Sequence, residues 1–98
     1  MTTETTKQVK TLFELGRTLA TPGALSTMTN FKIDPALLLN RHVTGDWQDM
    51  DADDQEANRE AVNQEARVFS AFVFGEVKFW VITEADRSST TILLPEEY

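Results

Sequence analysis

The segment RVFSAFVFGEVKFWVITE, residues 67–84, contains the clearest secondary-structure pattern of this chain. Two runs rich in aromatic and β-branched residues, Arg67–Phe74 and Val77–Glu84, flank the dipeptide Gly75-Glu76. Such runs are typical of strands, and a two-residue connection that begins with Gly favours a β-hairpin with a type II′ turn. The length of this turn fixes which residues face each other across the hairpin.

One face of this hairpin is predicted to be the core. It pairs Phe72 with Phe79 and Ser70 with Val81, and it carries no charge. On the opposite face, Arg67 lies across from Glu84, and such a pair supports the register by roughly 0.2–1 kcal/mol. That face also carries an apolar group of four residues, here called the sheet patch: Phe69, Ala71, Trp80 and Ile82. Two arrangements of this patch stay open. In the first, the helices and the N-terminal segment cover the patch; in the second, the patch is exposed and forms an interface, most simply that of a homodimer.

The rest of the chain predicts an α+β fold, in which short helices precede a C-terminal three-stranded antiparallel β-meander. The third strand of the meander covers about Thr90–Leu94 and is stopped by Pro95. Residues 11–20 are open between helix and strand, and Gly16 among threonines favours an extra N-terminal strand.

Three helix starts are visible between the N-terminal segment and the hairpin. Thr21-Pro22 and Asp34-Pro35 each place an N-cap residue before a proline, and Asp53 with Glu56 resembles a capping box. Gly45 is expected to end the second helix. The predicted helices cover Pro22–Met28, Pro35–His42 and Asp53–Ala66.

Length and composition indicate one domain, residues 11–98, after a flexible N-terminal tail, residues 1–10. The chain contains no cysteine, which excludes disulfides and thiolate chemistry and favours the cytoplasm. Its longest apolar runs are far too short to span a bilayer, so we expect no membrane association.

The acidic residues are concentrated in the middle third of the chain. The net charge is −7 overall, and residues 34–66 hold nine acidic and two basic side chains. Negative charge repels phosphate backbones, so direct nucleic-acid binding is not expected, whereas a basic protein surface is attracted. The alternative is that the charge only keeps the protein soluble. The six residues that we name the acidic surface are Asp49, Asp51, Asp53, Asp54, Glu56 and Glu60.

The sequence predicts neither a metal site nor a cofactor. Residues 49–60 place acids at several positions of a calcium-binding EF-hand loop, but Asp54 stands where that loop needs glycine. His42 is the sole histidine, and without cysteine it cannot form a typical zinc site.

A catalytic alternative uses the same histidine. A small metal-independent ribonuclease of the toxin type would use His42 as acid and base, Arg67 or Arg87 as phosphate clamp and Thr90 as a polar group. The acidity of the chain argues against RNA binding. His42 also has an ordinary explanation, because cations favour the C-terminal end of a helix.

Three segments carry a resemblance to a known family. They are RHVTGDW (residues 41–47), FWVITEADRS (79–88) and TTILLPEEY (90–98). Together they resemble small bacterial proteins carried on plasmids, phages and integrated elements, sometimes described as restriction-system accessories. The likeness covers about residues 12–98, and this chain has Gln48 where the family has Gly. The resemblance implies no catalytic residues.

These observations lead to one main hypothesis and two alternatives. The main hypothesis is a non-enzymatic interaction protein of a mobile element, which binds a host protein through the acidic surface or the sheet patch. Its most concrete version is an inhibitor that occupies the DNA-binding surface of a restriction or CRISPR-type nuclease. The alternatives are the ribonuclease and a homodimeric structural module.

Overall fold

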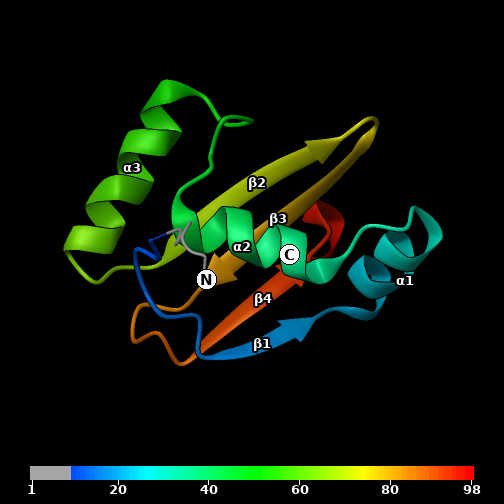
Figure 1. Cartoon of the computed structure of the whole chain (residues 1–98), viewed down its shortest axis with the longest axis horizontal. Coiled ribbons are helices and arrows are strands. Elements are labelled where there is room, and N and C mark those ends of the chain that lie inside the picture. Colours follow the sequence, from blue (N-terminus) through cyan, green and yellow to red (C-terminus); the bar gives the residue numbers. More distant parts are fainter. Residues whose placement is uncertain (1–9) are drawn as a thin grey trace, which may run out of the picture.

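Three helices and a four-stranded sheet make up residues 10–98, the part of the chain that the computed structural model describes (Figure 1). The elements are β1 (Arg17–Ala20), α1 (Pro22–Asn30), α2 (Pro35–Thr44), α3 (Ala52–Asn63), β2 (Val68–Phe74), β3 (Val77–Thr83), β4 (Ser89–Leu93) and a 3₁₀ turn, η2 (Pro95–Glu97). The predicted α+β class is therefore confirmed. The predicted tail, residues 1–10, lies almost entirely outside the described residues.

The hairpin of β2 and β3 has the predicted register. Phe72 pairs with Phe79, and Ser70 pairs with Val81. Gly75 has a φ of 64°, which the first position of the turn requires and which side chains disfavour. The turn therefore sets the pairing of the whole hairpin.

The sheet is mixed, because the predicted antiparallel meander is extended by a parallel N-terminal strand. Its strand order is β1-β4-β3-β2, and β1 runs parallel to β4 while the three C-terminal strands form the predicted meander. The N-terminal segment is thus a strand, but only over Arg17–Ala20. It is short because Gly16, with a φ of 67°, precedes it and Thr21 already caps α1. The third strand of the meander begins and ends one residue earlier than predicted.

The first two helices begin as predicted. The Thr21 side chain accepts a hydrogen bond from the main-chain N–H of Ala24, and Asp34 accepts one from Ala36. Gly45, with a φ of 81°, ends α2. Both helices extend two residues beyond their predicted ends.

The third helix differs from the prediction at both ends. Its N-cap is Asp51, whose carboxylate accepts from the N–H of Asp54 at 2.9 Å, so the helix does not start from an Asp53–Glu56 capping box. It ends at Asn63 instead of Ala66. The chain then turns at Glu65, which has a φ of 56°.

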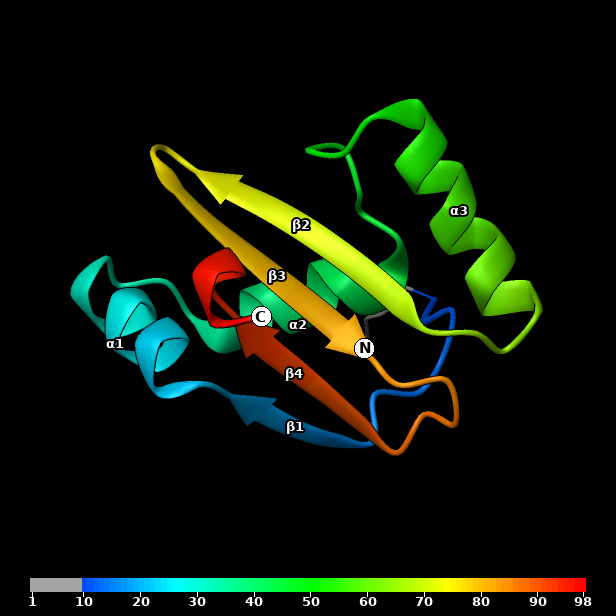
Figure 2. The same cartoon turned by 180° about the vertical axis from the view of Figure 1, so that it is seen from behind.

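The helices cover one face and one edge of the sheet. Figure 1 shows α2 in front of the sheet and α1 beyond the end of β1, and Figure 2 shows the opposite face with η2 upon it and α3 beside β2. The prediction that the first face of the hairpin is core is confirmed. On the second face, Ile82 is buried and Phe69, Ala71 and Trp80 are half-buried, so the sheet patch is neither fully covered nor fully exposed. The main buried cluster consists of Ala24, Met28, Leu38, Phe72, Phe79, Val81 and Ile92.

The described helices are short. None of those within residues 10–98 has the length and apolar character needed to cross a membrane.

Candidate functional site

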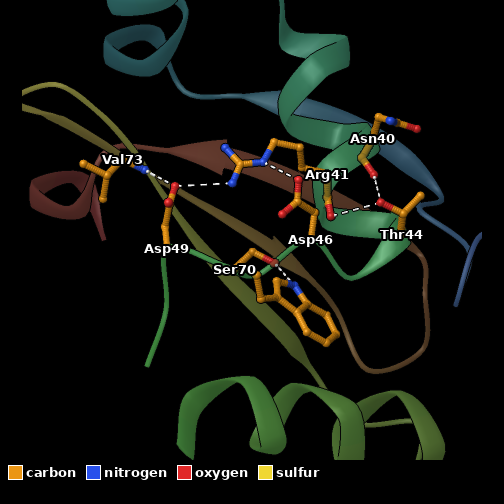
Figure 3. Close-up of polar contacts among 8 residues, drawn as sticks. Asn40, Arg41, Thr44, Asp46, Asp49, Ser70 and Val73 are labelled. Carbon is orange, nitrogen blue, oxygen red and sulfur yellow. Dashed lines mark hydrogen bonds and ion pairs between the residues drawn. The ribbon is translucent and has the colours of Figure 1, made fainter. Parts of the chain in front are cut away.

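The loop between α2 and α3 is fastened to the edge of β2 by an arginine and two carboxylates. Arg41 donates through Nε to Asp46 at 3.0 Å and through Nη2 to Asp49 at 3.4 Å. The same Asp49 oxygen accepts from the main-chain N–H of Val73 at 2.9 Å (Figure 3). The guanidinium of Arg41 lies over the ring of Phe72, with its carbon 4.5 Å from the ring centroid. Asp49 therefore holds the loop in place, and its charge is already paired.

A second fastening holds α3 to the same strand. Asn58 donates through Nδ2 to the carbonyl of Phe69 at 2.7 Å, and its Oδ1 accepts from the N–H of Phe69 at 3.1 Å. The side chain is only 4% exposed. Its amide thus satisfies both outward main-chain groups of one residue, as a neighbouring strand would do. We did not predict this role, although an asparagine among the small residues of a helix is a signal that could have indicated it.

Between these two fastenings lies Ala71. Main-chain groups of Phe69 and Val73 point out of the sheet edge, and residues two apart in a strand share that direction. Asn58 binds the outward groups of Phe69 on one side of Ala71, and Asp49 binds the outward N–H of Val73 on the other side. Within residues 10–98, no hydrogen bond reaches the outward N–H and carbonyl of Ala71.

A groove of about 470 Å³ opens at this position, between the start of α3 and the second face of the sheet. Its volume falls within the usual range of ligand sites. The lining residues are Asp49, Met50, Asp51, Asp54, Ala57, Asn58, Phe69, Ala71, Val73, Lys78 and Trp80. The groove therefore brings together the acidic surface and the sheet patch, which the sequence presented as separate candidates.

Some residues of the acidic surface and of the sheet patch do not line the groove. Asp53, Glu56 and Glu60 are exposed on α3 but do not line the groove. Glu56 forms an ion pair with Arg59 at 3.1 Å. From the sheet patch, Ile82 is only 3% exposed and also lies outside the lining.

The wall formed by α3 is negatively charged. Asp51 uses one oxygen to cap the helix, while Asp54 is exposed and takes part in no ion pair in the described part of the chain. Lys78, on the opposite side, carries the positive charge among the lining residues. Asp54 is therefore the lining carboxylate that is most available to a ligand.

The floor of the groove is aromatic. The rings of Phe69 and Trp80 have centroids 4.7 Å apart, and both side chains are half-buried. Beyond them, Tyr98 packs against Trp80 with a centroid distance of 5.6 Å. Arg67 donates to the Tyr98 hydroxyl at 3.1 Å and pairs with Glu84 at 3.5 Å. The C-terminal residue thus covers one end of the aromatic floor.

The second candidate, His42, lies inside the molecule. It is fully buried, with Nδ1 2.6 Å from the Ser70 hydroxyl and Nε2 2.8 Å from the Thr83 hydroxyl. Burial and, second, the positive charge of Arg87 lower the pKa of His42 to about 3. The ring of Phe13 packs edge-on against the imidazole at 5.1 Å. His42 is therefore neutral at physiological pH and out of contact with solvent.

The hydrogen bonds around His42 form one chain with a fixed direction. At one end the Trp47 indole N–H can only donate, and it donates to Ser70 at 2.8 Å. At the other end the Thr90 hydroxyl donates to the carbonyl of Leu15 at 2.7 Å, so it must accept from the Thr83 hydroxyl, 2.6 Å away. The imidazole consequently donates from Nε2 and accepts at Nδ1. Every member has a partner, and the chain joins α2 to β2, β3 and β4.

The four residues of the ribonuclease hypothesis do not form one open site. His42 and Thr90 belong to the buried chain, and Arg67 lies at the Tyr98 end of the opposite face. Arg87 donates to the carbonyls of Ala66 at 2.7 Å and Ala61 at 3.3 Å, so it caps the end of α3. This arrangement presents no accessible acid or base beside a phosphate clamp.

No family model, curated protein or solved structure matches the chain. Within residues 10–98, no three histidine or acidic side chains are grouped in a way that would hold a metal ion. The groove beside Ala71 is therefore the candidate site, on geometric grounds alone.

Proposed function

We propose that this protein is a binding module that recognises a basic, partly apolar surface of another protein through the groove. The observation that carries this proposal is the juxtaposition of the Asp51 and Asp54 carboxylates with the aromatic floor of Phe69 and Trp80. An apolar centre with charged groups at its rim is the usual composition of a protein–protein interface.

The charge of the groove favours a protein partner over a nucleic acid. Phosphate groups approaching the aromatic floor would meet Asp51 and Asp54 at close range, and Lys78 offsets only part of that charge. Lysine and arginine side chains of a protein would be attracted by the same carboxylates and would associate faster at low salt. Aromatic residues such as Trp80 are also the side chains that most often dominate binding energy.

The most specific version of this proposal is an inhibitor of a host defence nuclease of the restriction or CRISPR type. The DNA-binding surface of such an enzyme is rich in lysine and arginine. The carboxylates of Asp51 and Asp54, at the start of α3 and in the lining of the groove, would replace phosphates there. Both proteins would then meet in the cytoplasm, consistent with a chain that contains no cysteine.

The test is affinity capture from a bacterial lysate with four forms of the protein. The wild type is compared with Asp54→Asn and Trp80→Leu, which alter the groove, and with Asp53→Asn, which removes the same charge outside it. We expect a partner that wild type and Asp53→Asn retain at low salt and release at high salt, and that the groove variants lose. Equal retention by all four forms, or a partner that proves to be RNA or DNA, would contradict the proposal.

A further inference from the structure

We infer that the groove takes an arginine side chain of the partner, with its guanidinium between the aromatic floor and the carboxylate of Asp54. This inference rests on the proposed function and specifies the chemistry that the groove recognises. Two features of the described residues support it: the surroundings of Arg41 in the same molecule, and the aromatic and acceptor groups that line the groove. The chemical difference between arginine and lysine then selects the side chain.

The molecule already binds one of its own arginines in this manner. The guanidinium of Arg41 lies 4.5 Å from the centroid of Phe72 and donates to Asp46 and Asp49. Two further arginines lie over aromatic rings, Arg67 at 5.9 Å from Tyr98 and Arg87 at 5.4 Å from Phe13. An aromatic face beside carboxylate or carbonyl oxygens is thus a recurrent arginine environment in this chain.

The groove repeats the combination that surrounds Arg41. The rings of Phe69 and Trp80 supply the aromatic face, and Asp54 supplies a carboxylate without an ion-pair partner among the described residues. The outward carbonyl of Ala71 adds a second acceptor in the same lining. A cation that enters therefore meets an aromatic surface and two acceptors.

These groups suit arginine better than lysine. A guanidinium is planar, so it can stack on Trp80 while its five N–H groups reach Asp54 and Ala71. It is also more weakly hydrated than an ammonium group, so a half-apolar groove removes its water at a smaller cost. Cation–π attraction is strongest over tryptophan.

The experiment is a titration of isotopically labelled full-length protein with three capped tripeptides, followed by NMR. The probes are acetyl-Gly-Arg-Gly-amide, its lysine counterpart and its citrulline counterpart, which has the shape of arginine without the charge. We expect saturable shifts of the Ala71 amide and the Trp80 indole with the arginine peptide. The lysine peptide should bind about fivefold more weakly, as expected from the weaker stacking. Trp47, which is 2% exposed, provides an internal control that should not shift.

Two variants complete the design. Asp54→Asn should weaken binding of the arginine peptide about tenfold, and Asp53→Asn should leave it unchanged, while the rest of each spectrum shows that the fold is intact. Equal affinity for the lysine or citrulline peptide, or shifts away from the groove, would overturn the inference. If no peptide binds but capture of the partner still depends on Asp54, the arginine inference is wrong and the proposed function stands. Loss of that dependence contradicts the proposed function itself.

Discussion

Asn58 on α3 pairs with both outward main-chain groups of Phe69 on β2, at 2.7 and 3.1 Å. This contact sets the position of a helix that has few apolar side chains of its own. Ala61, two residues before the end of α3, is buried, but Ala57 is exposed. The amide of Asn58 therefore fixes the distance between the acidic wall and the aromatic floor.

Replacing Asn58 with alanine should destabilise the protein by about 1–3 kcal/mol, because both main-chain groups of Phe69 lose their partner. The free energy of unfolding, measured with urea, gives this value. The matched control is Asn63→Ala, an exposed asparagine at the end of the same helix, which has a similar gain in helix propensity. Faster hydrogen exchange at Phe69 should accompany the loss, and an unchanged stability would contradict the role of Asn58.

The stability of the protein should fall as the pH drops below 6.5. The pKa of His42 is about 3 in the folded state and about 6.5 in the unfolded chain. Between these values only the unfolded state binds the proton, and this binding favours unfolding. The contribution of the buried, neutral His42 to stability is therefore complete above pH 6.5 and is lost toward pH 3. The free energy of unfolding should change by up to about 1.4 kcal/mol per pH unit, because the unfolded state binds about one proton more than the folded state.

His42 is the sole histidine of the chain, so the interval from pH 5 to 6.5 isolates its titration from that of most carboxylates. Urea unfolding across this interval measures the slope. In His42→Gln the slope should disappear, whatever the absolute stability of that variant. The same slope in wild type and variant would show that His42 is not buried as described.

Breaking the buried chain in the sheet should also lower stability. Thr83→Val keeps the side-chain shape but leaves the His42 Nε2–H without an acceptor and Thr90 without a donor. We expect a loss of about 1–3 kcal/mol in the free energy of unfolding. Thr91→Val, on the opposite face of the neighbouring strand, is the control, and it should change stability by about 0.5 kcal/mol or less. Equal effects would mean that the hydroxyl chain contributes nothing.

The sequence predicted best those features that are local. The register of β2 and β3 follows from a two-residue turn and from the alternation of side chains, and both lie within residues 67–84. The starts of α1 and α2 follow from an N-cap and a proline side by side. Such signals need no knowledge of the rest of the chain, so they could be read directly.

Features that depend on distant contacts were not predictable in this way. The parallel pairing of β1 with β4 joins residues more than seventy positions apart, and no local pattern indicates it. The position of α3 depends on one amide and one strand edge, and the acidic surface and sheet patch meet because of it. Ser70 and Thr83 are polar residues on the core face of the hairpin, but their partner His42 comes from another element, so their contact was not predicted.

We propose that the groove beside Ala71, and not the total negative charge, recognises a basic protein. Isothermal titration calorimetry of the captured partner with Asp54→Asn and Asp53→Asn separates these two possibilities, since both variants change the net charge equally. We expect about tenfold weaker binding for Asp54→Asn, a loss of about 1.4 kcal/mol in the free energy of binding. For Asp53→Asn we expect the affinity to change by no more than about twofold. Equal weakening by both substitutions would contradict the claim, because charge anywhere on this side of the molecule would then suffice.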